Sequence, residues 1–159
     1  LSSIVKEDLE NIRKFIAFGK DDLLDGNKLA IVGGEFVENK LRLLDSLIFL
    51  CNEIFLVGKV GYYFLLAKGK IITSNEISHK NITIMTKIMK KANRLGVIIH
   101  LPSDFIVTDD SFEKSTTTKS IGGDCKFYQI SVGGENIESP FIPLDIGSNT
   151  AQHIQKVIS

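Results

Sequence analysis

The chain has 159 residues, 43% of them hydrophobic, and a formal net charge of zero. This length fits one domain with a sizeable core, and the apolar content excludes an intrinsically disordered chain. The neutral charge gives no reason to expect nucleic acid or an anionic membrane surface as a partner. No apolar run reaches the roughly 18 residues that a membrane span requires, so the sequence predicts no membrane insertion.

The first third of the chain predicts a helix, a buried strand and a second helix. Apolar residues at helical spacing predict the first helix over residues 4–18. Leu29–Val32 is a short, continuously apolar run, which indicates a strand buried on both faces. Gly33 and Gly34 end that strand. Apolar residues on one helical face then predict a helix over residues 37–51.

The middle third continues this alternation. Four elements are expected in chain order: a strand at Glu53–Val57, a short helix at Gly61–Ala67, an amphipathic helix over residues 80–95 and a third strand at Val97–Leu101. Strands that alternate with helices indicate right-handed crossovers and a mostly parallel sheet.

The pattern changes in the last third. Strand-like runs at residues 104–108 and 126–132 flank a polar, Thr-rich stretch, which predicts an antiparallel excursion or a long loop. Leu144–Ile146 is a short segment with apolar ends. A last helix is predicted over residues 149–158.

The cysteine and histidine residues match no metal-binding spacing. Cys51 and Cys125 lie far apart in the sequence, and we interpret them as reduced, partly buried thiols of an intracellular protein. His79, His100 and His153 are scattered, and we interpret them as structural or surface residues. The sequence therefore predicts no metal site.

The Gly33-Gly34 pair before a predicted helix is a candidate anion-binding element. Free N–H groups and the helix dipole at such a position attract phosphate. Glu35, at the start of the same helix, would compete with a bound phosphate. The sequence has no Gly-x-Gly-x-x-Gly motif and no Gly-Lys-Ser/Thr motif, so it supports neither a dinucleotide fingerprint nor a Walker loop.

Four segments of the chain carry motifs of one family signature, in the family's order. They are Lys28–Leu41 with Gly33, Gly34, Val37 and Lys40 in register, Val57–Phe64, Leu101–Asp104 and Pro143–Ser148. Together they resemble the C-terminal, nucleotide-binding domain of phosphoglycerate kinase. The resemblance implies an α/β, three-layer Rossmann-like domain with a mostly parallel sheet. It also implies that residues 1–159 are a single such domain, without the family's N-terminal domain and the final part of the C-terminal one.

The resemblance further implies a nucleotide site for Mg-ADP or Mg-ATP. The residues that match the family's site are Gly33, Gly34, Lys40, Gly58 and Leu144. Lys40 is expected either to meet a phosphate or to be a solvated helix lysine. The resemblance leaves open whether the site still binds a nucleotide.

Substitutions at three places depart from the family pattern. Phe36 stands where the family has a lysine that contacts the transferred phosphate, and a phenyl ring can neither donate a hydrogen bond nor carry charge. Val57 and Lys59 stand where glycines let the backbone approach the base. Pro143 replaces another glycine and removes an N–H donor. We therefore predict no catalytic residue in this chain.

These departures lead to three hypotheses about function. The favoured one is a phosphoglycerate-kinase-like protein with a degenerate nucleotide site, which acts as a non-catalytic structural or binding subunit of a larger assembly. The second is a fragment of a divergent, active phosphoglycerate kinase, which transfers a phosphoryl group between ATP and 3-phosphoglycerate in glycolysis. The third is a module that senses ADP or ATP without turnover. An incomplete domain leaves a sheet edge or apolar face open, and we expect either further chain or, in the favoured hypothesis, a protein partner to cover it.

Overall fold

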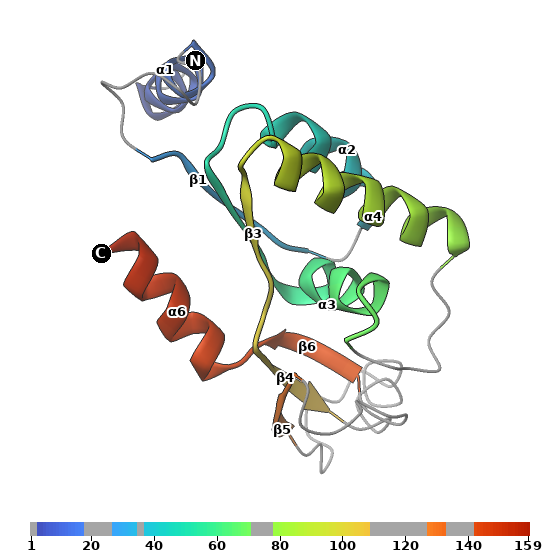
Figure 1. Ribbon diagram of the computed structural model, residues 1–159. Coiled ribbons are helices and arrows are strands. Elements are labelled where there is room, and N and C mark those ends of the chain that lie inside the picture. The colour runs from blue at the N-terminus through green and yellow to red at the C-terminus, as the bar shows by residue number, and fades with distance from the viewer. Residues whose placement is uncertain (1–2, 18–26, 35–36, 71–77, 109–126, 133–141) are drawn as a thin grey trace, which may run out of the picture.

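The computed structural model describes residues 3–17, 27–34, 37–70, 78–108, 127–132 and 142–159 (Figure 1). In chain order the elements are α1 (Ser3–Ala17), β1 (Leu29–Val32), α2 (Val37–Leu47), β2 (Glu53–Leu56), α3 (Gly58–Ala67), α4 (His79–Arg94), β3 (Ile98–His100), β4 (Asp104–Thr108), β5 (Phe127–Ser131), β6 (Ile142–Ile146) and α6 (Ser148–Ile158). They form two three-stranded sheets with helices around them.

The first sheet, sheet A, is parallel with the strand order β1-β2-β3. Its strands are separated by helices, as parallel strands require. Alternate residues point to opposite faces. One face carries Ile54 and Leu56 into the main core, where they meet the buried sides of α2 and α4 (Figure 1). On α4 that side is made by Met85, Ile88 and Ala92, which follow the helical repeat.

Helix α6 lies on the opposite face of sheet A, which gives the three layers (Figure 1). The ring of His153 on α6 meets the ring of Phe55 on β2 edge-on, with 5.5 Å between the ring centroids. Coverage of this face is incomplete, because Ile31 on β1 is 49% exposed and Ile98 on β3 is 54% exposed.

The second sheet, sheet B, is antiparallel with the strand order β5-β4-β6. The antiparallel excursion predicted after the third strand is therefore confirmed for residues 104–108 and 127–131. On the other side of β4, the pairing with β6 shifts register between Ile106 and Val107, and Pro143 lies opposite Val107. A proline cannot donate to a ladder, so an edge strand beside an irregularity is where it is tolerated.

Helix α3 joins the two sheets. Its Val60 and Phe64 side chains belong to the core of sheet A, whereas Tyr62 and Leu65 pack with Phe105 and Val107 of sheet B. A helix that is apolar around most of its surface is buried on more than one side. This burial holds the start of α3, at Gly58, in a fixed position relative to the ends of β1 and β2.

The expected α/β class with a parallel sheet is confirmed, with small differences at element ends. Helix α3 begins at Gly58 rather than Gly61, and α2 ends at Leu47 rather than residue 51. Cys51 is a buried, free thiol, and burial raises its pKa. Cys125 lies outside the described residues. Among the helices that the structure describes, none is long and apolar enough to cross a membrane.

Candidate functional site

Four of the five predicted site residues meet at the carboxyl ends of β1 and β2. A Cβ built on Gly58 would lie 3.9 Å from the amide nitrogen of Gly34, and one built on Gly34 would lie 3.5 Å from Cε of Lys40. Gly33 and Gly34 directly follow β1, and Gly58 opens α3 directly after β2. The carboxyl ends of neighbouring parallel strands are where α/β domains bind ligands. We call Gly33, Gly34, Lys40 and Gly58 the glycine edge.

Two positions on the glycine edge require glycine for their backbone shape. Gly34 has φ 114° and Gly58 has φ 56°, both in the region that side-chain-bearing residues avoid. The positive φ at Gly58 turns the chain from β2 directly into α3. Neither position is tightly packed, because the nearest atom to a built Cβ lies 3.5 Å away at Gly34 and 3.9 Å away at Gly58.

Gly33 differs from these two because it is constrained by a neighbour. A Cβ built there would lie 2.8 Å from Cγ2 of Val57 and 3.5 Å from the Val57 carbonyl oxygen. The Val57 amide also donates a 2.9 Å hydrogen bond to the carbonyl of Val32. The Val57 side chain therefore packs directly against the backbone of Gly33 and fills the space between the two strand ends.

This contact gives a testable expectation for Gly33. Gly33→Ala is expected to lower the free energy of unfolding by about 2 kcal/mol, because the new methyl group overlaps Val57. Val57→Ala should remove most of that loss when the two changes are combined, since they share one contact. Urea denaturation of the two single variants and the double variant measures the coupling. Additive losses would show that Val57 is not the obstacle.

The fifth predicted residue, Leu144, comes from sheet B. It lies on β6, is half-buried, and belongs to a strand that packs against α3. Glu35 and Phe36 lie outside the described residues. The structure thus assembles the glycine edge from β1, α2 and α3 and places Leu144 on an element that contacts the last of these.

Asp104 forms a buried polar centre that links two of the sequence motifs. Its carboxylate accepts hydrogen bonds from Oγ1 and the amide of Thr150 at 2.6 and 2.8 Å, from the amide of Asn149 at 2.9 Å, and from Nε2 of Gln129 at 2.8 Å. A Cβ built on Gly147 would lie 2.3 Å from the same carboxylate. Gly147 is therefore a glycine because the Asp104 carboxylate occupies the start of α6.

The ionised form of Asp104 is favoured by these donors. Burial alone raises the pKa of the Asp104 carboxyl, but the hydrogen bonds from Thr150, Asn149 and Gln129 together outweigh it, so its pKa lies below the ordinary value. The negative charge also faces the positive end of the α6 dipole. Asp104 thus caps α6 from a distant strand, and it leaves no room there for a bound anion.

A third polar cluster joins sheet A to α6 and was not predicted. Nε2 of His100 lies 2.7 Å from Oε2 of Glu53, and Nε2 of His153 lies 3.2 Å from Nδ1 of His100. The His100 ring also stacks on Phe55, with 4.1 Å between the ring centroids. Two of the three histidines interpreted as scattered thus meet in space. Among the described residues, no group of three or more His, Cys, Asp or Glu side chains is arranged so that it could hold a metal ion.

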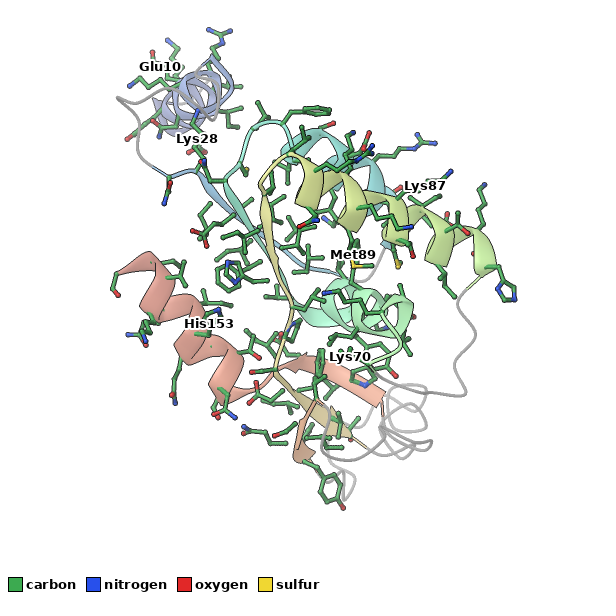
Figure 2. All side chains as sticks on the ribbon, viewed as in Figure 1. Glu10, Lys28, Lys70, Lys87, Met89 and His153 are labelled. Carbon is green, nitrogen blue, oxygen red and sulfur yellow. The ribbon has the colours of Figure 1, made fainter. Side chains whose placement is uncertain are left out.

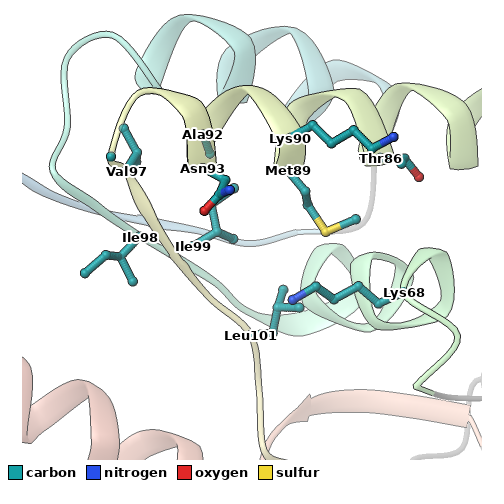
Figure 3. Close-up of a pocket in the computed structure, with 11 residues that line it drawn as sticks. Lys68, Thr86, Met89, Lys90, Ala92, Asn93, Val97, Ile98, Ile99 and Leu101 are labelled. Atoms are coloured by element: carbon teal, nitrogen blue, oxygen red, sulfur yellow. The ribbon is translucent and has the colours of Figure 1, made fainter.

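A cavity of about 580 Å³ lies between α4, β3 and the end of α3 (Figure 3). Its lining includes Met89 from α4, Leu101 after β3, and Lys68, which follows the far end of α3 from Gly58. Met89 extends from α4 toward α3 in the wider side-chain view as well (Figure 2). None of the predicted site residues lines this cavity.

The fold and the glycine edge place the chain in a class of α/β domains: those that bind a ligand at the carboxyl ends of their parallel strands. The family model described as phosphoglycerate kinase matches residues 4–159, so the chain belongs to the phosphoglycerate kinase family.

Relatives support this assignment over much of the chain. The phosphoglycerate kinase of Borreliella afzelii is 34% identical over 130 residues, which cover 82% of this chain and 30% of that protein. The enzyme of Aplysia californica is 32% identical over 133 residues, 82% of this chain and 29% of its own length. The solved phosphoglycerate kinase of Coxiella burnetii has a TM-score of 0.72 at 21% identity, and the match covers 94% of this chain and 35% of that one. The chain spans about 30% of the length of these curated relatives.

Proposed function

We propose that this chain is a non-catalytic member of the phosphoglycerate kinase family, which serves inside the cell as a structural or binding subunit of a larger assembly. Its residues form one domain of the family's C-terminal type, and a protein partner covers its incompletely covered sheet. The observation that carries the proposal is the packing of Val57 against Gly33, because it fills the gap at the strand ends that face a nucleotide in the family.

Two further substitutions support the loss of chemistry. Phe36 replaces a lysine of the family signature, and loss of one preorganised cationic donor costs about 10²–10³ in the rate of a charge-developing reaction. Pro143 is buried on β6 and has no N–H to donate at a position where the family has glycine. Both changes reduce what the site offers to a nucleotide.

A second candidate function follows from Lys40. Its side chain reaches to the backbone of Gly34, so the glycine edge still combines a lysine with two glycines of positive φ. This arrangement favours a divergent phosphoglycerate kinase that transfers a phosphoryl group between ATP and 3-phosphoglycerate. A sensor that binds Mg-ADP or Mg-ATP without turnover would use the same residues.

Titration with Mg-ADP tests the proposal directly. We expect no saturable heat and no rise in Tm at millimolar Mg-ADP, because Val57 fills the gap beside Gly33. Binding would be detected, since a ligand at 100 times its Kd would add about 2.7 kcal/mol to the stability. Val57→Gly should then gain nucleotide-dependent stabilisation, whereas Val132→Gly, which removes a half-buried valine directly after β5, should gain none. Micromolar binding by the unmodified chain would support the sensor, and turnover with 3-phosphoglycerate would establish the kinase.

A further inference from the structure

The outer surface of the domain carries a groove between α2 and α4. Its volume is about 810 Å³. The floor is apolar: Leu41 of α2 and Ile88 of α4 are buried there, and Ile84 of α4 is half-buried. The groove runs between α2 and α4, and its lining contains none of the glycine-edge residues.

The charge of this groove is strongly one-sided. Its lining contains five cationic residues, Arg42, Lys80, Lys87, Lys91 and Arg94, and two anionic ones, Glu38 and Asp45. The chain as a whole is neutral, so this excess of three positive charges on one surface is balanced by negative charge elsewhere. A concentrated positive surface on a neutral protein attracts acidic partners and raises their association rates.

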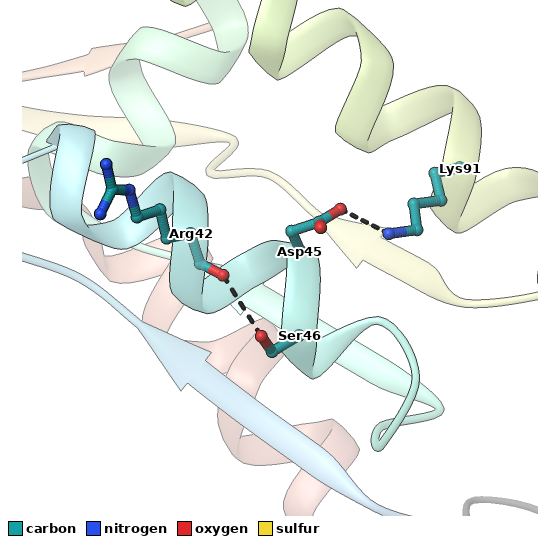
Figure 4. A network of polar contacts seen from close by, with 4 residues as sticks. All are labelled: Arg42, Asp45, Ser46 and Lys91. Carbon is teal, nitrogen blue, oxygen red and sulfur yellow. Dashed lines mark hydrogen bonds and ion pairs between the residues drawn. The ribbon is translucent and has the colours of Figure 1, made fainter.

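Two oppositely charged residues of the groove lining, Lys91 and Asp45, form an ion pair with each other. Nζ of Lys91 lies 2.5 Å from Oδ1 of Asp45 and joins α4 to α2 (Figure 4). The same ammonium group lies 4.3 Å from the centre of the Phe49 ring, which is otherwise exposed. Lys91 therefore already has two partners within the molecule and is less available to a ligand than the other cations.

Three of the remaining cations form a regular row. Lys80, Lys87 and Arg94 are spaced by seven residues along α4, which places them on one side of the helix over about 21 Å. Within the part of the chain that the structure describes, none of the three forms an ion pair or a side-chain hydrogen bond. Carboxylates seven residues apart on a second helix, on every second turn, would match this spacing.

We infer that this groove binds an acidic amphipathic helix of a partner protein. The apolar residues of the partner would lie on Leu41, Ile84 and Ile88, and its carboxylates would face Lys80, Lys87 and Arg94. Helices that bind in grooves use this combination of apolar anchors and charged margins. Single-stranded nucleic acid is less suited to the surface, because it binds on exposed aromatic rings and the groove lining has none.

A second copy of this chain fits the groove less well than an acidic partner. Helix α1 has apolar residues exposed to solvent, with Leu9 41% and Ile12 54% exposed. Within α1 the three acidic residues, Glu7, Asp8 and Glu10, are matched by three basic ones, Lys6, Arg13 and Lys14. Helix α1 therefore lacks the net negative charge that the groove would select.

The inference rests on the proposed binding role and specifies the chemistry of the partner. Its test uses the full chain and an 18-residue synthetic peptide of leucine and glutamate arranged as an amphipathic helix. We expect saturable binding that weakens with salt, and binding at least tenfold weaker for a peptide of the same composition in scrambled order. The comparison with the scrambled peptide separates the contribution of the apolar floor from the attraction between charges, because both peptides carry the same charge.

A matched pair of variants locates the binding surface. The triple variant Lys80→Glu, Lys87→Glu and Arg94→Glu should lose at least tenfold in affinity for the peptide. The control, Lys6→Glu, Arg13→Glu and Lys14→Glu, makes the same charge change on exposed residues of α1 and should leave affinity unchanged. Thermal denaturation of each variant confirms folding before the titration.

Several results would overturn the inference. These are no binding, equal binding of the scrambled peptide, equal loss in both triple variants, and tighter binding of an 18-nucleotide RNA. Dimers in light scattering that dissociate when the peptide is added would assign the groove to a second copy. Mg-ADP titrations of the same variants report on the glycine edge separately, so failure of the groove and failure of the proposed function are distinguishable.

Discussion

Replacing Asp104 with alanine is expected to lower the free energy of unfolding by about 3 kcal/mol. The change leaves the amides of Asn149 and Thr150 without their acceptor, and a buried donor without a partner costs about 1–3 kcal/mol. It also removes the negative charge at the start of α6. Urea denaturation at pH 7 measures the loss. Asp145→Ala, at an exposed aspartate on β6, is the matched control and should cost less than about 1 kcal/mol.

The same carboxylate predicts how stability depends on pH. Since hydrogen bonds hold the folded pKa of Asp104 below its unfolded value of about 3.9, its contribution is fully present above that value. The contribution is lost as the pH falls through the folded pKa. Asp104→Asn should therefore show a smaller loss of stability between pH 5 and pH 2 than the unmodified chain. An identical acid profile would mean that Asp104 does not contribute as a carboxylate.

The second large effect is expected at Gly61, in the interior of α3. A Cβ built there would lie 2.6 Å from the carbonyl oxygen of Leu56 and 2.7 Å from Cγ of Pro102. A glycine inside a helix is normally improved by alanine, by about 1 kcal/mol. At this position the methyl group must displace a backbone atom and a proline ring, so we expect Gly61→Ala to lose about 3 kcal/mol.

Gly96 provides the comparison for Gly61. It has φ 68° and no atom within 4 Å of a built Cβ, so Gly96→Ala tests backbone strain without a collision. That variant should lose about 1 kcal/mol. Thermal denaturation of both variants separates the two causes. A Gly61→Ala variant as stable as the unmodified chain would show that α3 can move away from Pro102 without penalty.

Much of the fold could be predicted because its signals are local. Leu29–Val32 matched the observed strand β1, and the apolar repeat of Met85, Ile88 and Ala92 identified the buried side of α4. The predicted start of α3, at Gly61, is three residues late, because Gly58 was interpreted only as the end of the preceding strand. Gly58 turns the chain and Gly61 allows close packing, and both are consistent with a helix that is buried on two sides.

The glycine edge was predictable for the same reason, since each of its residues follows or begins a recognisable element. The contact between Gly33 and Val57 was not, because it depends on the distance between two strand ends. The Glu53, His100 and His153 cluster depends on sheet register and on the placement of α6. The sequence did contain one signal for this cluster: Glu53 and His100 are polar residues on strands that are otherwise apolar.

The close packing of the Asp104 carboxylate against Gly147 affects how the family motifs should be interpreted. Any side chain at 147 would collide with the carboxylate at 104, so natural selection for a folded domain acts on the two positions as one unit. That selection continues whether or not a phosphoryl group is ever transferred. The presence of these two motifs therefore indicates that the fold is retained, and it does not indicate that the activity is retained. Loss of activity would first become visible at positions such as 36, 57 and 143.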